Sequence, residues 1–325
     1  MTDIVGFILP LIVLGSIVIP VVVYLALGMG EAVLAALPAG FARHSRPWLW
    51  LFLPIALVVT ILIFPVIVTI FTSFSDARAE TWVGADNYRW AFSGSMLDIV
   101  GNNIVWLIVF PVITLILALA TAALFDKVRY EPLAMTIVIL PTAISFTAGS
   151  VIWTQMYSFQ PSGTPQIGTF NAVLDLFGLD PVPWLIAPVI NNLALIFIAV
   201  WLQLGIATLI LSSAIKNVGT EMIEASRLDG AGEWRVFFAM VLPNILPSVL
   251  VVLTTMIIAA LKVFDIVYVM TAGNYGTDVI ANKLYYELFA ANNLGHASAI
   301  AVVLLFSALP IALINIFQFR SEARA

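Results

Sequence analysis

Few residues in this sequence have the type and spacing that catalytic chemistry needs. The two histidines, His44 and His296, lie far apart and lack companions at metal-ligand spacing, so each is interpreted as an ordinary interface residue and no metal site is predicted. No lysine is followed by Ser or Thr, so the phosphate-binding loop G-x-x-x-x-G-K-[ST] is missing. No G-x-S-x-G nucleophile motif occurs either. We therefore expect no catalytic residue and no cofactor bound by this chain.

The composition explains this scarcity of reactive groups. Of the 325 residues, 62% are apolar and 10% are charged, and the mean hydropathy is +1.10. A soluble domain is about half apolar and about a quarter charged, so this composition excludes a soluble globular protein. The net charge of −5 argues against a nucleic-acid partner, which would require a basic patch, and the absence of cysteine excludes a disulfide framework.

Seven apolar runs are long enough to cross a lipid bilayer, which takes about 20 residues. They cover residues 4–27, 48–71, 103–125, 133–156, 189–212, 245–269 and 298–317. Lipid cannot satisfy backbone polar groups and the runs lack strand-like alternation, so the predicted fold class is an all-α polytopic membrane protein of about seven helices. No basic residue precedes the first run, so we expect an uncleaved helix rather than a secretory signal.

Basic residues are concentrated on one side of the predicted membrane. Three of them, Arg78, Arg89 and Lys283, fall in one set of alternate connections, and nine fall in the other set. The nine are Arg43, Arg46, Lys127, Arg129, Lys216, Arg227, Arg235, Arg320 and Arg324. Cytoplasmic loops are enriched in Lys and Arg. This distribution predicts an N-terminus outside the cell and a C-terminus in the cytoplasm.

Two charges, Lys262 and Asp265, fall within the sixth run. An i,i+3 spacing places opposite charges on one face of a helix. Ionisable groups in a membrane are costly and usually face a partner or a water-filled cavity. We expect these two residues to act in an outer gate or a helix contact; the alternative is that Lys262 reaches toward the outer interface.

One connection, residues 213–244, is too long for a simple link between neighbouring helices. Thr220 is predicted as the N-cap of a helix EMIEASRLD, with Glu221 in its first turn and Gly230 as its left-handed stop. A second amphipathic stretch is predicted to end at Pro243, with apolar residues at helical spacing, namely Trp234, Phe237, Phe238 and Val241. The two helices would form a projecting knob, which either packs against its own bundle or docks a cytoplasmic partner.

The string EASRLDGAGEWRVFFAMVLPNILPS resembles the cytoplasmic signature of the permease subunits of binding-protein-dependent ABC importers. The matching residues are Glu224, Ala225, Asp229, Gly230, Ala231, Leu242 and Pro243, and Ser226 replaces a second alanine. The resemblance implies that residues 216–243 are the coupling segment, seated in a cleft of an ATP-hydrolysing subunit. The implied contacts are Glu224, Ala225, Ser226, Arg227, Asp229, Gly230 and Ala231. ATP and magnesium would be used by that partner, so this chain is not expected to be an enzyme.

A second stretch, from Leu261 to Phe306, is similar to the end of the sugar-permease branch, found in maltose, glycerol-phosphate and α-glucoside importers. The branch pattern is matched at Phe264, Asp265, Tyr268, Thr271, Gly273, Tyr285, Phe289, Gly295, Ala297, Ala299 and Ile300. The usual Gly-Gly-Pro is replaced by Gly273-Asn274-Tyr275. The resemblance covers about residues 48–320. It implies an additional N-terminal helix and cytoplasmic linker at residues 1–47 and a six-helix permease domain at residues 48–325.

The resemblance implies a multi-pass subunit of an ATP-driven oligosaccharide or α-glucoside importer in a bacterial inner membrane. Its implied partners are a second permease subunit, a dimer of ATP-binding subunits and an external substrate-binding protein. Sugar recognition needs aromatic faces and hydrogen-bonding groups in a cavity. Candidates within the spans are Trp106, Trp153, Tyr157, Trp201, Gln203, Thr254 and Thr255. The alternative is an ion-coupled secondary transporter of small solutes, which would be expected to use intramembrane carboxylates, and only Asp265 comes close to one.

Overall fold

A computed structural model describes the backbone of residues 2–126 and 128–322 and the side chains of residues 18, 20–126, 128–219, 221–311 and 313. Lys127 and Arg324, which were used to predict the orientation, lie outside the described residues, as do the side chains of Thr220 and Arg320. The chain divides into two compact units, Met1–Val68 and Thr69–Ala325. The second unit contains most of the membrane-crossing helices and both candidate sites.

The first unit is a helical hairpin. It contains α1 (Thr2–Ala35) and α2 (Ala39–Val58), and α2 continues through η1 (Val59–Ile63) into α3 (Phe64–Thr72), which runs into the second unit. Glu31 joins the two arms: its carboxylate accepts hydrogen bonds from Arg46 Nε at 2.9 Å and from Trp50 Nε1 at 2.8 Å. A carboxylate held by two donors from the other arm fixes how α1 pairs with α2.

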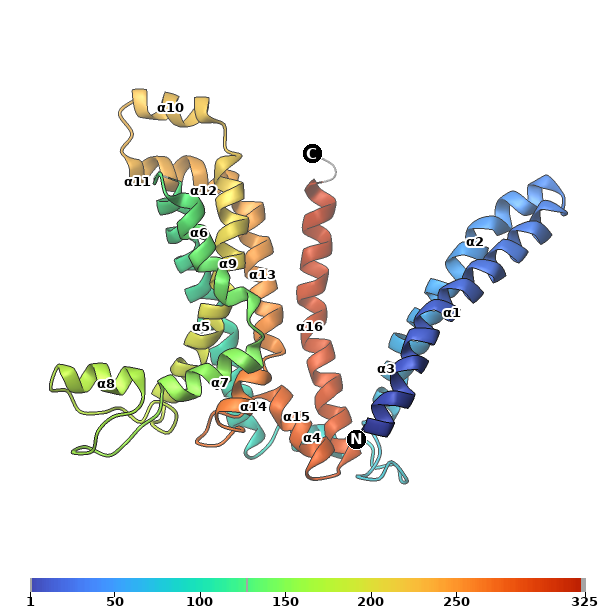
Figure 1. Cartoon of the computed structure of the whole chain (residues 1–325), viewed down its shortest axis with the longest axis horizontal. Coiled ribbons are helices and arrows are strands. Elements are labelled where there is room, and N and C mark those ends of the chain that lie inside the picture. The colour runs from blue at the N-terminus through green and yellow to red at the C-terminus, as the bar shows by residue number, and fades with distance from the viewer. Residues whose placement is uncertain (1, 127, 323–325) are drawn as a thin grey trace. The chain divides into compact units, whose positions relative to one another are not determined.

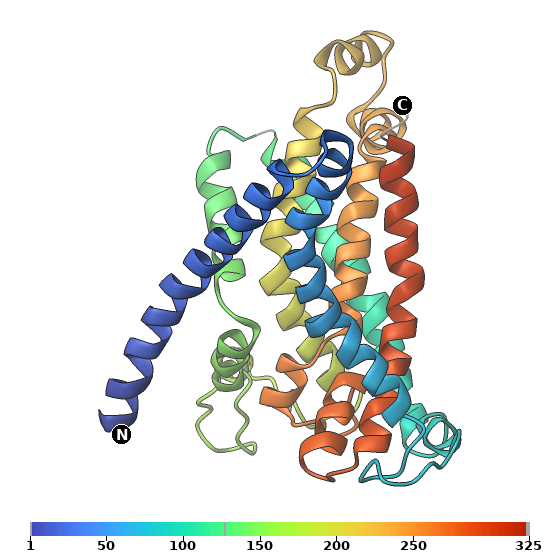
Figure 2. The same cartoon turned by 90° about the vertical axis from the view of Figure 1, so that its right-hand side faces the viewer.

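Four long helices form the core of the second unit: α5 (Met96–Phe125), α9 (Ile190–Lys216), α13 (Leu246–Leu261) and α16 (Leu294–Glu322). α5 packs against both α9 and α13, and α13 also contacts α16 (Figures 1 and 2). The centre of the core is apolar, with Trp106, Leu195, Leu211 and Met256 almost completely buried. Lipid is as apolar as these side chains, so the helices are held together by close van der Waals packing and not by removal of apolar surface from water.

Shorter elements cap the two ends of the second unit. They are α4 (Asp86–Ala91), α6 (Glu131–Ile139), η2 (Leu140–Ala143), α7 (Phe146–Met156), α8 (Thr169–Leu176), α10 (Thr220–Leu228), α11 (Glu233–Val236), η3 (Phe237–Val241), α12 (Leu242–Asn244), α14 (Asp265–Met270) and α15 (Ile280–Phe289). One end carries α10, α11 and the end of α16, and the other carries α4, α8, α14 and α15 (Figure 1). These are called the α10 end and the α8 end below.

The predicted all-helical membrane fold is confirmed. Within the described residues, four helices are long and apolar enough to cross a membrane, and the number rises to six when each of two bent pairs is counted as one span. The bent pairs are Glu131–Ala143 with Phe146–Met156, at 100°, and Glu233–Asn244 with Leu246–Leu261, at 73°. A shorter apolar helical stretch, Pro20–Ala35, accompanies these six.

Prolines account for the irregular turns in these spans. A proline ring clashes with the carbonyl four residues earlier. For Pro65 that carbonyl belongs to Ile61 within the π-helical turn η1, and for Pro243 it belongs to Ala239 within the π-helical turn η3. Pro141 lies in the 3₁₀ turn η2, at the 100° bend. At these three prolines the chain continues by widening, tightening or bending, as expected where neighbouring helices re-satisfy freed backbone groups.

The prediction for the sixth run was wrong in one respect. A single helix over residues 245–269 was expected, but α13 ends at Leu261 and a separate short helix, α14, begins at Asp265. Lys262 is the C-cap residue of α13 and Phe264 the N-cap residue of α14. Lys262 and Asp265 therefore lie on opposite sides of a helix break, and not one turn apart on a single helical face.

Gly205 gives a test of how closely α9 packs against the bend that follows α6. A Cβ atom at Gly205 would lie 2.6 Å from the carbonyl oxygen of Val138 and 2.7 Å from Cα of Ile139. Because these are backbone atoms, Gly205→Ala is expected to cost about 3 kcal/mol, at the upper end of overpacking effects, and to lower the melting temperature in detergent. Gly101→Ala in α5 is the control, since nothing lies within 4 Å of its new methyl group. An unchanged melting temperature for Gly205→Ala would contradict the packing.

Candidate functional site

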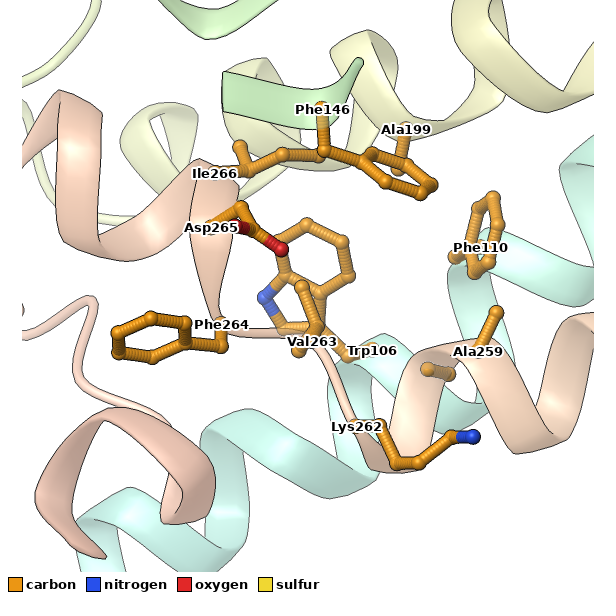
Figure 3. A pocket seen from close by; sticks show the side chains of 11 residues that line it. Trp106, Phe110, Phe146, Ala199, Ala259, Lys262, Val263, Phe264, Asp265 and Ile266 are labelled. Atoms are coloured by element: carbon orange, nitrogen blue, oxygen red, sulfur yellow. The ribbon is translucent and has the colours of Figure 1, made fainter. Parts of the chain in front are cut away.

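A cavity of about 250 Å³ lies where two helix breaks meet. Trp106 and Phe110 of α5 form one wall, Phe146 at the start of α7 forms another, and residues 262–266 close it from the break between α13 and α14. Figure 3 shows Trp106, Phe110, Phe146 and Asp265 from these segments around the cavity. Broken membrane helices expose backbone and helix ends that continuous helices keep satisfied, and they are where transporters commonly form binding sites.

The cavity contains an unused hydrogen-bond donor. Trp106 is fully buried, and its indole Nε1 has no partner among the described residues. Most buried polar atoms are hydrogen-bonded, so an exception calls for an explanation. A ligand oxygen in the cavity would satisfy this N–H.

The Asp265 carboxylate is the acceptor in the same cavity. It is the first residue of α14, where the helix dipole favours a negative charge. Its Oδ1 accepts a hydrogen bond from Thr147 Oγ1 in α7 at 3.2 Å, so it also ties the two half-helices together. Lys262 lines the cavity as well, but its side chain extends away from Asp265 (Figure 3), and no ion pair joins the two residues in the described part of the chain. The predicted helix contact therefore runs from Asp265 to Thr147 instead.

The combination of groups favours binding without catalysis. Phe110, Phe146 and Phe264 offer apolar ring surface, while Trp106 and Asp265 offer one donor and one charged acceptor. Ligand pockets are typically about 300–1,000 Å³, so this smaller cavity suits one ring of a ligand with apolar faces and a hydroxylated edge.

The other predicted pathway residues lie elsewhere. Trp153 and Tyr157 are buried in an aromatic cluster with Phe170 and Trp184, and the Tyr157 hydroxyl donates to the Ala194 carbonyl at 3.2 Å. The hydroxyls of Thr254 and Thr255 donate to carbonyls of their own helix. Gln203 is half-buried on α9. None of these residues belongs to the described lining of the cavity, so the structure brings together Trp106, Lys262 and Asp265 only.

The second candidate site is the coupling segment, at the α10 end. Its first helix begins one residue earlier than predicted, with Gly219 as N-cap in place of Thr220, and Glu221 lies in the first turn as expected. Gly230 follows the helix with φ of +84°, which confirms the predicted left-handed stop. The Gly230 N–H donates a hydrogen bond to the Arg227 carbonyl, and the Ala231 N–H donates one to the Ser226 carbonyl. These two bonds form a Schellman motif, in which a glycine at this position satisfies the last carbonyls.

The coupling helix presents most of its predicted contacts to the outside. Glu224, Ala225, Arg227, Asp229 and Gly230 are exposed, and Ala231 is half-buried. Ser226 is buried and its hydroxyl donates to the Met222 carbonyl at 2.8 Å, so its role is internal to the helix. Arg227 makes two hydrogen bonds to Glu233, at 3.0 and 3.3 Å, which brace the helix against the start of α11. Sequence reasoning missed Leu228, which is 88% exposed beside these polar groups.

The apolar face predicted for the second helix is only partly buried. Val241 is buried and Phe237 half-buried, but Trp234 and Phe238 are exposed and stack on each other at 5.9 Å. The reason is the π-helical turn at residues 237–241, which adds one residue per turn and rotates the face away from the expected 3.6-residue period. Trp234 and Phe238 line an apolar groove of about 630 Å³ beside the end of α5.

A polar network at the α8 end was also missed by sequence reasoning. Residues 271–279 form a loop with left-handed backbone at Ala272, Gly273, Tyr275 and Gly276. Its carbonyls accept hydrogen bonds from amide side chains at the start of α5 and α9: Asn102 to Gly276 and Asp278, and Asn191 to Tyr275. Burial raises the pKa of Asp278 within this loop. The only sequence signal was the pairing of asparagines, Asn102-Asn103 and Asn191-Asn192, at the start of two apolar runs.

Comparisons with known proteins agree with this geometry. Residues 91–325 match the family of binding-protein-dependent transport system inner membrane components. The chain is 45% identical to an osmoprotective compounds uptake permease of Synechocystis sp., over 81% of this chain and 95% of the relative. It is 37% identical to an alpha-glucoside transport system permease of Rhizobium meliloti, over 87% of this chain and 84% of the relative. A bacterial ABC transporter for alginate import has a similar fold, with a TM-score of 0.72 at 22% identity over 87% of this chain and 96% of that one.

The family fixes several properties that the geometry leaves open. Its permeases bind no cofactor themselves, span the inner membrane several times, and work with an ATP-hydrolysing subunit and a substrate-binding protein. Since ATP is hydrolysed by a partner, the alternative of an ion-coupled secondary transporter is not supported. The chain belongs to the family of binding-protein-dependent transport system inner membrane components and is the permease subunit of an ABC importer.

Proposed function

We propose that this permease imports a sugar, an oligosaccharide or α-glucoside, and forms half of the translocation pathway beside a second, similar permease. The observation that carries the proposal is the cavity at the two helix breaks, where aromatic walls meet the free indole N–H of Trp106 and the Asp265 carboxylate. A pyranose ring has apolar C–H faces that stack on aromatic rings and hydroxyls that both donate and accept hydrogen bonds. The cavity offers one group for each of these interactions.

The names of the relatives support two substrate classes. One relative is named for alpha-glucosides and the other for osmoprotective compounds. A quaternary-ammonium osmolyte would also find aromatic faces and a carboxylate here, but it has no hydroxyl to donate to that carboxylate. The wall of the cavity is mostly aromatic and aliphatic, and its carboxylate is the natural acceptor for hydroxyls, so we favour the sugar.

The coupling step is proposed to use α10. The helix would sit in a cleft of one of two ATPase copies, with Glu224, Ala225, Arg227 and Asp229 as contacts. ATP-driven closure of the ATPase pair would then pull on α10 and shift the bundle between inward- and outward-facing states. Such a shift requires contacts that differ between the two states.

We further propose that the α10 end is cytoplasmic and the α8 end outside, with an outer N-terminus. Lys216 ends α9 shortly before α10 and pairs with Glu131 at the start of α6, and Arg235 lies in α11, so both basic residues are at the α10 end. Their position supports this orientation under the positive-inside rule. Residues 1–47 are proposed to be an additional helix and cytoplasmic linker, and residues 48–325 the permease domain.

The test is a substrate screen with the assembled importer. The permease, its partner subunits and the cognate binding protein are reconstituted in proteoliposomes with ATP inside. Uptake of labelled maltose, trehalose and sucrose is compared with that of glycine betaine, an osmolyte without a sugar ring. We expect ATP-dependent accumulation of at least one of the sugars. Accumulation of glycine betaine alone would reject the sugar assignment and indicate that the importer transports an osmoprotectant.

A further inference from the structure

Four aromatic rings form a continuous ladder at the α8 end. Phe264 and Tyr268 stack with ring centroids 5.1 Å apart, Tyr268 meets Tyr285 at 5.0 Å, and Tyr285 meets Phe289 at 4.8 Å. Phe264 also contacts Tyr285 directly, at 5.2 Å. These residues are called the aromatic ladder below.

The spacing of the ladder follows from two helices. Residues four apart share one face of a helix, so α14 places Tyr268 one turn beyond its N-cap Phe264, and α15 places Phe289 one turn beyond Tyr285. The two helices lie together at the α8 end (Figure 1). The rings therefore run in sequence across two elements and are not a single local contact.

The ladder connects the cavity to the surface. Phe264 is part of the cavity wall, Tyr268 is 43% exposed, and Phe289 at the other end is 64% exposed. The aromatic cluster around Trp153 and Tyr157 differs, because both of those side chains are buried in the core. Core packing accounts for that cluster, but it does not account for the exposure of Tyr268 and Phe289, between which Tyr285 is half-buried.

The ladder also carries uncharged polar groups. The rings of Tyr268 and Tyr285 are in contact, and the neighbouring Tyr268 phenol raises the pKa of Tyr285, which keeps the Tyr285 hydroxyl protonated at physiological pH. A surface of ring faces interrupted by neutral hydroxyls is suited to sugar rings, which offer apolar faces and a hydroxylated edge.

We propose that the aromatic ladder is an entry track for the transported sugar, along which glycosyl rings stack as they pass from the outer face into the cavity. The proposal rests on the proposed sugar import and extends it, because it assigns Tyr268, Tyr285 and Phe289 as a second carbohydrate-binding subsite outside the cavity. The charged groups of α15 are not part of the ladder. Glu287 is buried and pairs with Lys283 and His296.

The first experiment removes one ring at a time in the reconstituted importer. Phe289→Leu and Tyr268→Leu are each expected to raise the KM for maltose about fivefold, since one aromatic contact is lost. Phe289→Tyr keeps the ring and should restore the KM. Tyr286→Leu is the matched control, because Tyr286 is 53% exposed on the same helix but lies outside the ladder; its KM should not change.

The second experiment uses the absence of cysteine from this chain. Phe289→Cys, Tyr268→Cys and the control Tyr286→Cys are each labelled on this subunit with a membrane-impermeant maleimide while the importer turns over with maltose-loaded binding protein. We expect maltose to slow labelling at positions 268 and 289 at least threefold, compared with binding protein free of sugar, and not at position 286.

The outcomes separate the ladder from the sugar assignment. Wild-type maltose uptake with equal KM values for all variants and no protection from labelling would reject the ladder alone. If Phe289→Leu instead fails to co-purify with the second permease, the ladder is a subunit interface and the proposal is overturned. Failure of the wild-type importer to take up any of the three sugars would reject the proposed function itself, before any variant is compared.

Discussion

Gly230→Ala is expected to lower ATP-driven uptake about tenfold while the permease still folds and inserts. Gly230 has φ of +84° and closes the Schellman motif that ends α10. Nothing lies within 4 Å of a Cβ atom at this position, so the effect comes from the backbone alone. A non-glycine residue in the left-handed region costs about 1–2 kcal/mol. That cost would loosen the last turn of α10, where the proposed ATPase contacts are concentrated.

Gly232→Ala is the matched control for this prediction. Gly232 lies two residues further on, also with open space around it, but its φ is −70°. Alanine adopts that conformation without strain, so uptake should stay at the wild-type level. Uptake, basal ATPase activity and co-purification of the ATPase are measured for both variants. Wild-type uptake for both variants would contradict a role for the left-handed cap in coupling. A loss of uptake in both variants would instead indicate that added side chains crowd the segment.

The coupling segment was predictable from sequence because its signals are local. The glycine stop, the acidic first turn and the amphipathic spacing act within a few residues, and the structure shifts the helix start by only one residue, from Thr220 to Gly219. The exposure of Trp234 and Phe238 was not predictable, because the segment contains a π-helical turn next to Pro243 that periodicity does not show. Periodicity assumes 3.6 residues per turn and fails where a proline changes that number.

The cavity was harder to predict because it depends on two helix breaks with different signals. Pro141 marks the break between α6 and α7 in the sequence. The break at residues 262–264 contains neither proline nor glycine, so the apolar run appeared continuous. The sequence singled out Lys262, Asp265 and Trp106 by their chemistry, and all three line the cavity. It could not show that Asp265 faces Thr147 of α7, because that contact joins residues 118 positions apart.

Asp265→Ala is expected to lower sugar uptake about tenfold, chiefly through a higher KM, with assembly intact. A hydrogen bond to a charged group contributes about 1.5–3 kcal/mol, and the alanine variant loses both the bond to Thr147 and the proposed acceptor for a sugar hydroxyl. Thr147→Val removes the helix contact alone and keeps the carboxylate in the cavity, so it should cause a smaller loss. The difference between the two variants isolates the contribution of the carboxylate to substrate binding.

Asp180→Ala is the control for the carboxylate, because Asp180 is exposed in the loop that follows α8 and lies outside the cavity lining. Its uptake should equal that of the wild type. Initial rates at several maltose concentrations, together with size-exclusion profiles of the purified complex, distinguish a binding defect from an assembly defect. If Asp265→Ala transported maltose with an unchanged KM, the carboxylate would be a structural tie between α14 and α7 only. A loss of complex on the column would likewise remove Asp265 from the substrate site, because the uptake defect would then arise from misassembly of the two half-helices.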